Sequence, residues 1–229
     1  MKPVINNNTG RKRWQASAEL QTVLIALGIL SSILYIITDI AASVMWSNYS
    51  HTSQTVSELI AVNAPTRLYV AILFTIYDLL IYAYGVGIMI SSNGKRALKI
   101  AAFLIITKEI LGLVATLFFP IHLRGVEGNF SDTMHGILTA AGVFLCMFPA
   151  MIAGAVSFKG RFRVYSIITM ILFVIFGILA GSDQPKYALD MPTPMMGIWE
   201  RINIYGYMFW IVVLSVMLLR FKKLNESPK

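Results

Sequence analysis

The sequence predicts an all-α polytopic membrane protein, a bundle of six transmembrane helices with both termini in the cytoplasm. Of its 229 residues, 57% are hydrophobic and 13% are charged, whereas soluble domains carry about 25% charged residues. The hydrophobic residues form long runs, and about 20 residues of α-helix cross the roughly 30 Å hydrocarbon core of a bilayer. In this class, a net charge of +8 indicates basic cytoplasmic loops, so the partner is the lipid bilayer and no nucleic acid is expected.

Six hydrophobic runs and two polar tails divide the chain. Residues 1–18 are polar and basic and predict a cytoplasmic tail, and residues 222–229 predict a second one. The expected membrane domain is 19–221, with spans at about 20–46, 68–90, 100–119, 133–158, 164–181 and 202–219. Tight basic turns after the second and fourth spans alternate with longer polar loops on the opposite side.

Each span has a signal at one end. The first ends at Trp46, and tryptophan favours the headgroup region. The second precedes an Asn93-Gly94 turn, and the third stops before Pro120. Asp132 precedes the fourth span, where a carboxylate meets the positive end of a helix dipole. The fifth contains Gly177 and Gly181, a spacing typical of helix packing, and Trp199-Glu200-Arg201 comes just before the sixth.

The distribution of Lys and Arg predicts the orientation. The tails and the two tight turns carry 14 of them, whereas the opposite loops carry four, Arg67, Arg124, Lys186 and Arg201. Basic residues concentrate on the cytoplasmic side. We therefore expect a multi-pass protein of the plasma membrane with both termini in the cytoplasm. The outer loops are mildly acidic and include Glu58, which is typical either of solvated loops or of a site for a divalent cation or a cationic headgroup.

Four ionisable residues fall inside the expected spans: Asp39, Asp78, Lys108 and Glu109. Each costs at least about 2.5–3.5 kcal/mol at the bilayer centre, so intramembrane charges are candidates for binding or relay sites. We expect Lys108 to neutralise Asp78, because a short turn joins their spans, and adjacent helical residues point about 100° apart.

Polar residues recur at helical spacing on the first three spans. They predict either a shared hydrated interior or a hydrogen-bond network that only fixes helix packing. These stripes are Ser32, Tyr35, Asp39 and Ser43; Thr75, Asp78 and Tyr82; and Lys108, Gly112 and Thr116.

The three histidines lie in the outer segments, and two of them lie near a carboxylate. Asp132 and His135 are three residues apart, so they share one face of a helix, while His122 and His51 lie on preceding loops. Two or three imidazoles and a carboxylate could bind zinc with one position open for water. A divalent metal is therefore one candidate cofactor, and the alternative is that these histidines cap helices or make hydrogen bonds.

Three short motifs resemble a known family. They are Ser57-Glu58-Leu59 to Ala64-Pro65, Phe119-Pro120 leading to Met134-His135-Gly136, and Gly197-Ile198-Trp199-Glu200-Arg201. Together they are similar to the prokaryotic membrane proteins grouped as domain of unknown function 998, over about residues 20–220. The resemblance implies six helices and outward-facing polar motifs and brings no substrate. Many members carry an Asp soon after the Phe-Pro pair, where this chain has His122.

Three hypotheses of function follow from these patterns. The first is an outward-facing polar pocket of His51, Asp132, His135 and Arg201 above Asp39 and Asp78, which binds or hydrolyses a lipid or small polar substrate. As a hydrolase it would use His135 and Asp132 as acid and base or metal ligands, and Arg201 would hold an anionic group. The second is a small permease or proton-coupled carrier that uses Asp39, Asp78, Lys108 and Glu109. The third is a structural or assembly subunit.

Overall fold

The computed structural model describes the backbone of residues 7–226 and the side chains of residues 18–221, and this part of the chain is helical. Six helical segments are long and apolar enough to cross a membrane, which confirms the predicted fold class. They are Ala18–Met45, Arg67–Ile90, Arg96–Phe118, Phe130–Ser157, Arg161–Ala188 and Met196–Phe221. The outermost parts of both predicted tails lie outside the described residues, while residues 7–18 of the first are helical.

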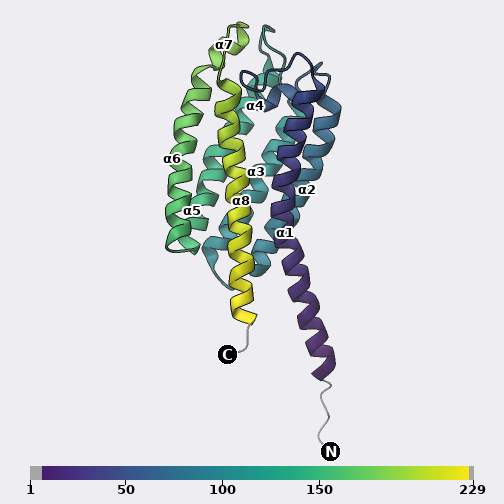
Figure 1. Cartoon of the computed structure of the whole chain (residues 1–229), viewed down its shortest axis with the longest axis vertical. Helices are drawn as coiled ribbons and strands as arrows, with labels where there is room; N and C mark the ends of the chain where they lie inside the picture. Colours follow the sequence, from purple (N-terminus) through teal and green to yellow (C-terminus); the bar gives the residue numbers. More distant parts are fainter. Residues whose placement is uncertain (1–6, 227–229) are drawn as a thin grey trace, which may run out of the picture.

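Residues 7–226 contain eight α-helices and two short helices of other types, one 3-10 and one π (Figure 1). The elements are α1 (Asn7–Met45), η1 (Val56–Ile60), α2 (Arg67–Ser91), α3 (Arg96–Phe118), α4 (Phe130–Ala141), η2 (Gly142–Met147), α5 (Phe148–Ser157), α6 (Arg161–Ser182), α7 (Gln184–Ala188) and α8 (Met196–Glu226). The fourth span combines α4, the π-helical turn η2 and α5. Pro149 lies in the first turn of α5, where its missing N–H cannot continue the preceding hydrogen-bond ladder.

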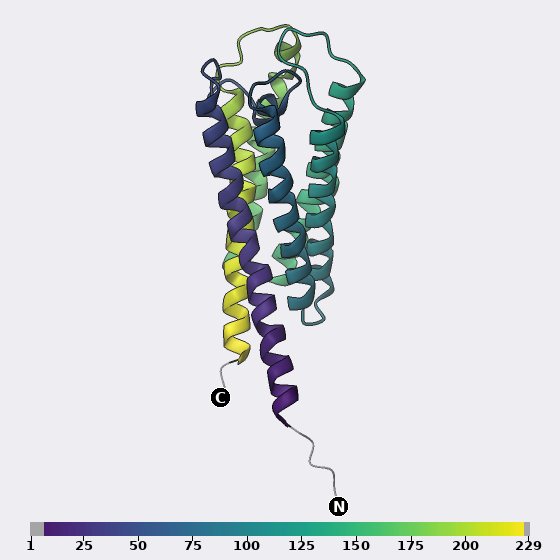
Figure 2. The same cartoon turned by 90° about the vertical axis from the view of Figure 1, so that its right-hand side faces the viewer.

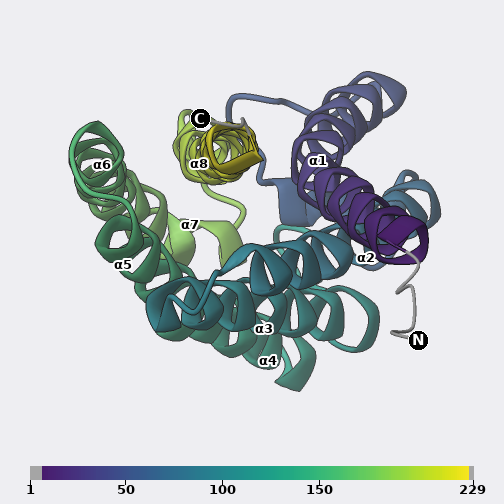
Figure 3. The ribbon, with the colours of Figure 1, turned by 90° about the horizontal axis from the view of Figure 1, so that it is seen from below.

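The spans form a ring in which each packs against the next along the chain, and the sixth closes back on the first. In the view along the bundle, α8 lies between α6 and α1 (Figure 3). The ring runs α1, α2, α3, α5, α6, α8 and returns to α1. Successive spans run in opposite directions and their number is even, so both ends of the described chain lie at one end of the bundle (Figures 1 and 2).

The three long loops gather at the opposite end from the termini (Figure 2). They are residues 46–66, which contain η1, residues 119–129, and residues 183–195, which contain α7; together we call them the outer cap. The last helix starts at Met196 rather than near Ile202, so Glu200 and Arg201 are helical, and the Arg201 side chain is buried. The hydropathy pattern placed the start of this span too late, because the two charged residues lower the local hydropathy.

The apolar core occupies the half of the bundle nearest the termini. Its side chains are at most 6% exposed and come from all six spans; they include Ile25, Ile81, Tyr84, Ile88, Leu98, Ala102, Ile105, Met151, Phe162, Trp210, Ile211, Leu214 and Leu218. A smaller apolar cluster around Leu59 and Val70 supports the cap. The buried charged side chains Asp39, Asp78, Glu109 and Arg201 lie between this core and the outer cap.

Candidate functional site

A buried ion pair between Arg201 and Asp39 lies at the centre of the capped end. Arg201 Nε is 2.8 Å from Asp39 Oδ2, and Arg201 Nη2 is 2.9 Å from Asp39 Oδ1. The side chains are 3% and 0% exposed. Tyr205 donates a further hydrogen bond to the same carboxylate. The guanidinium fork matches a carboxylate in this bidentate geometry, and the pair joins α1 to α8.

Arg201 also holds the first outer loop. Its Nη1 donates to the backbone carbonyls of His51, at 2.9 Å, and Gln54, at 2.8 Å, and its Nη2 donates to Tyr49 Oη at 2.6 Å. With the two bonds to Asp39, all five donors of the guanidinium are used. Arg201 is thus committed to protein groups and has no donor left to clamp an anionic ligand.

A second buried pair, Arg124 with Glu58, joins the three loops of the cap. Arg124 Nε and Nη2 are each 2.9 Å from a Glu58 oxygen, and Glu58 is fully buried. Arg124 also donates to the carbonyl of Ser53 and the hydroxyl of Thr193. Burial opposes the charge of Arg124, but the hydrogen bonds and charge of Glu58 outweigh it and raise the pKa of the guanidinium. The sequence identified Glu58 and missed Arg124 as its partner.

His51 lies at the rim of the Arg201–Asp39 pair. Its Nε2 is 3.7 Å from Asp39 Oδ2, and its side chain is 40% exposed. Partial burial and the positive charge of Arg201 lower the pKa of His51, and Asp39 opposes this only in part. Burial likewise raises the pKa of the neighbouring Tyr49 phenol well above its ordinary value. At neutral pH this rim therefore carries a neutral imidazole and a neutral phenol.

The other two histidines lie on the loop before α4 and in its first turns, and they have different partners. Asp132 accepts hydrogen bonds from the backbone N–H of His122, at 2.7 Å, and faces His122 Nδ1 at 2.8 Å. It also accepts from the backbone of Asn129, closing a capping box at the start of α4. His135 is buried, and its Nδ1 donates to the carbonyl of Phe119 at 2.9 Å. Asp132 therefore orients His122 and not His135.

The candidate metal ligands do not converge. His51 faces Asp39, His122 faces Asp132, and His135 faces a backbone carbonyl. Within residues 18–221, no group of three or more His, Cys, Asp or Glu side chains is arranged to hold a metal ion. A zinc site needs at least three protein ligands around one point, and these four residues do not provide it.

In the middle of the bundle, Lys108 pairs with its chain neighbour Glu109 and not with Asp78. Lys108 Nζ is 2.9 Å and 3.1 Å from the two Glu109 oxygens, and Tyr77 Oη donates to Glu109 Oε1 at 2.8 Å. The prediction that Lys108 pairs with Asp78 is wrong. The Cα–Cβ bonds of Lys108 and Glu109 diverge, but the flexible lysine side chain bends back and reaches the adjacent carboxylate. Asp78 is only 5% exposed.

Three of the six hydroxyls in the predicted polar stripes donate to a backbone carbonyl of their own helix. Ser43 donates to the carbonyl of Asp39, Thr75 donates to that of Ala71, and Ser32 donates to that of Gly28. Ser32 also reaches the carbonyl of Met208 on α8, at 3.2 Å. These three hydroxyls therefore contribute to packing, and the charged residues remain the candidates for function.

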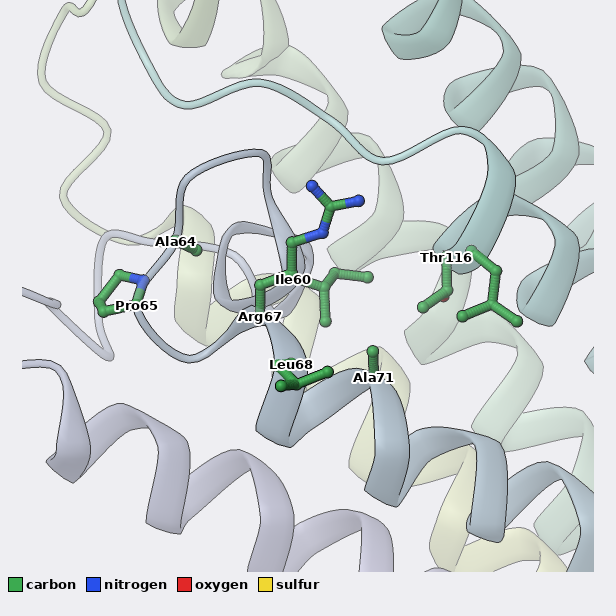
Figure 4. A pocket seen from close by; sticks show the side chains of 8 residues that line it. Ile60, Ala64, Pro65, Arg67, Leu68, Ala71 and Thr116 are labelled. Carbon is green, nitrogen blue, oxygen red and sulfur yellow. The ribbon is translucent and has the colours of Figure 1, made fainter.

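A surface pocket opens at the edge of the cap, between η1, the start of α2 and the end of α3 (Figure 4). It has a volume of about 400 Å³ and is lined by Ile60, Ala64, Pro65, Arg67, Leu68, Ala71, Thr116 and Leu117. In Figure 4 the Arg67 guanidinium extends away from α2 toward the loops, while Leu68 and Ala71 lie along the helix. The other outer cations, Arg124, Lys186 and Arg201, each pair with a carboxylate. Among residues 18–221, Arg67 has no such partner.

Six apolar spans, a polar cap at one end and charges inside the bundle define a multi-pass helical membrane protein. The family model described as "Protein of unknown function (DUF998)" matches residues 29–217. The chain belongs to this family, as its three motifs suggested. No curated protein and no solved structure matches the chain.

The family motifs carry the residues that hold the cap together. Glu58 lies in the first motif, the third contains Arg201, and His135 of the second donates to the Phe119 carbonyl within the same motif. Sequence reasoning missed Arg124, Tyr77 and Arg67 as site residues. One feature of the sequence could have identified Arg67, because it is a cation of the outer loops that lies directly before a predicted span.

Proposed function

We propose that this is a plasma-membrane protein, with both termini in the cytoplasm, that binds a phospholipid phosphate at the outer edge of its bundle. The observation that carries the proposal is that Arg67, in the pocket of Figure 4, has no carboxylate partner among the described residues. A buried or half-buried arginine stabilises phosphate through paired, charge-assisted hydrogen bonds. Leu68 and Leu117 are exposed on the same side and provide an apolar surface for the acyl chains.

The position of Arg67 suits a lipid better than a solute. It is the first residue of α2, at the level where a span leaves the hydrocarbon for the headgroup region. The positive end of the α2 dipole adds a favourable field for an anion there. The pocket lies on the outside of the ring, at a lipid-facing edge, and not in the interior beneath the cap.

The lipid site is tested by retention of phospholipid. Wild type and Arg67→Gln are purified in mild detergent and titrated with phosphatidylglycerol, and bound lipid is counted by native mass spectrometry. Loss of a charged hydrogen-bond partner costs about 1.5–3 kcal/mol, so we expect binding to weaken at least about tenfold. Lys186→Gln, which removes an outer charge already paired with Asp183, is the matched control. Equal binding by wild type and Arg67→Gln would refute the site, and competition by inorganic phosphate alone would indicate a soluble anion instead.

The orientation is tested by cysteine labelling. Cys146 is buried and is the one cysteine of the sequence, so a Cys146→Ser background accepts single probes at exposed positions. With a membrane-impermeant maleimide on intact cells, we expect Glu127→Cys to react and Lys159→Cys to react only after permeabilisation. The reverse pattern would invert the assigned orientation.

A hydrolytic role is a second proposal, supported by the His122–Asp132 pair. Asp132 fixes Nδ1 of His122 at 2.8 Å, which leaves Nε2 free to accept a proton from water during attack on an ester. The loop is tied to the pocket side, because Val62 N–H donates to the carbonyl of Ile121 at 2.8 Å. Purified protein in phosphatidylglycerol bilayers should release fatty acid or headgroup, and His122→Gln should abolish this while His135→Gln should not. No release above the lipid background would refute this role.

A further inference from the structure

The middle of the bundle contains two carboxyl groups and one ammonium group. Glu109 is 2% exposed and Asp78 is 5% exposed, so neither reaches bulk water in this conformation. Lys108 supplies one positive charge and lies over the ring of Tyr207, 4.8 Å from its centroid. If both carboxyls were ionised, the cluster would carry one uncompensated negative charge inside the membrane.

The two carboxyl groups differ in their hydrogen bonds. Glu109 accepts one bond from Tyr77 and two from Lys108, and donors to a carboxylate stabilise its charged form. Asp78 makes no hydrogen bond within residues 18–221, although it lies within electrostatic range of both Lys108 and Glu109. An ionised carboxylate in that position would lack both a cation of its own and any donor.

The groups around Asp78 come from three helices and add no further cation. They are Tyr77 and Tyr82 on α2, Lys108 and Glu109 on α3, and, across the cluster, Tyr207 on α8. The hydroxyls of Tyr82 and Tyr207 are buried and have no hydrogen-bond partner in the described structure. Buried polar groups normally have hydrogen-bond partners. These two hydroxyls could therefore each form a hydrogen bond with a water molecule or a bound ion.

We propose that Asp78 is a proton-binding site in the membrane interior, a neutral carboxylic acid beside the ionised Glu109–Lys108 pair. One proton on Asp78 makes the cluster electrically neutral, and it converts the acceptor-only carboxylate into a donor. A metal ion would need several oxygen ligands around one point, and no group of three or more acidic or histidine side chains is so placed in residues 18–221.

Side chains pack on both sides of Asp78 along the bundle axis, and Asp78 is 5% exposed. Toward the cap, Tyr35 stacks on Phe74 with ring centroids 4.3 Å apart and meets Tyr77 edge-on at 5.1 Å. Toward the termini lie the fully buried Ile81, Ile88 and other residues of the apolar core. A proton that moves between Asp78 and either end of the bundle must therefore pass these packed side chains. This is the property that a site needs if protonation is to be linked to a change of conformation.

A membrane-soluble carbodiimide tests the proposal, because it reacts with protonated carboxyls. The acid O–H adds across one C=N bond, and the adduct rearranges to a stable N-acylurea, so the whole reagent is added and nothing leaves. In wild type reconstituted in bilayers at pH 7, we expect mass spectrometry to find the adduct on Asp78 and not on Glu109. Asp78→Asn should lose it. Infrared difference spectra of wild type minus Asp78→Asn should show one carboxylic-acid carbonyl band that exchanges slowly in D2O.

Two charge variants should change the carbodiimide labelling in opposite directions. A carboxyl with a purely structural role would not produce this pattern. Lys108→Met removes the cation, so Glu109 must also take a proton and a second labelled site should appear. Glu109→Gln leaves Lys108 with Asp78 as its nearest carboxyl, so Asp78 should ionise and its label should be lost. Wild type with neither adduct nor band would overturn the proposal, as would unchanged Asp78 labelling in Glu109→Gln. Protection of Asp78 by Na⁺ at constant pH would show that the site binds a metal cation instead of a proton.

Discussion

Arg201 Nε lies 2.8 Å from Asp39 Oδ2 and Arg201 Nη2 lies 2.9 Å from Asp39 Oδ1, so two residues 162 positions apart form a bidentate pair. Both side chains are buried, at 3% and 0% exposure. The same guanidinium holds the carbonyls of the first outer loop. This pair joins α1 to α8 at the capped end of the bundle. The position of the first outer loop depends on it, because the same guanidinium binds that loop.

Removing one partner of this pair should destabilise the protein strongly. Asp39→Asn leaves a buried guanidinium without its counter-charge, and breaking a buried ion pair costs about 3–5 kcal/mol. The midpoint of thermal unfolding in detergent measures the change. Lys186→Gln is the control, because the Lys186 side chain is 46% exposed in its pair with Asp183, and such surface pairs contribute about 0–1 kcal/mol. Equal losses in both variants would show that the Arg201–Asp39 pair has no special role.

Stability should fall as pH drops below about 6.5, partly through His51. The pKa of His51 is lowered in the folded protein by partial burial and by Arg201, so the unfolded chain, with a pKa of about 6.5, binds a proton first. The stabilisation that neutral His51 gives the folded protein is complete above the pKa of the unfolded chain. It is lost as pH falls from that value toward the lower pKa of His51 in the folded protein. His51→Gln should flatten the pH dependence of the unfolding midpoint in this window. An unchanged slope, or an imidazole NMR titration above 6.5, would contradict this assignment.

Loss of the Arg124 fork should loosen the cap and leave the spans intact. Arg124→Gln removes the two bonds to Glu58 and the bonds to Ser53 and Thr193. Hydrogen bonds to charged groups contribute about 1.5–3 kcal/mol each, so amide hydrogen exchange in residues 50–60 should be about tenfold faster or more. Exchange in the turn at residues 158–160, at the other end of the bundle, serves as the internal reference. Equal acceleration at both ends would indicate global unfolding and not a local release of the cap.

Gly197→Ala should be poorly tolerated because the first outer loop lies directly against this glycine. An added Cβ would meet the backbone carbonyl oxygens of Gln54 and of His51, the latter at 2.7 Å. Neither can move without breaking its bond to Arg201, and overpacking costs at least about 1–3 kcal/mol. Gly136→Ala is the matched control, since a Cβ there meets nothing within 4 Å. The yield of monodisperse protein and the unfolding midpoint should fall only for Gly197→Ala.

Several features of the fold could be read from local sequence. The six spans follow from run length and composition, and the cap at the start of α4 follows from Asn129 and Asp132. The start of α8 could not be read in this way, because Glu200 and Arg201 lower the local hydropathy. Their burial becomes favourable only when Asp39 and the backbone of Val56 supply partners, at 2.8 Å and 2.6 Å.

The sequence by itself determined the membrane class, the number of spans and the residues whose burial needs an explanation. These follow from hydrophobicity and charge, which act on each segment independently of its neighbours. Only the tertiary structure decided the partners: Asp39 with Arg201, Glu58 with Arg124, Lys108 with Glu109, and Asp132 with His122. A long side chain can reach several carboxylates at similar energy, so the choice depends on helix rotation and loop packing, which no short stretch of sequence specifies.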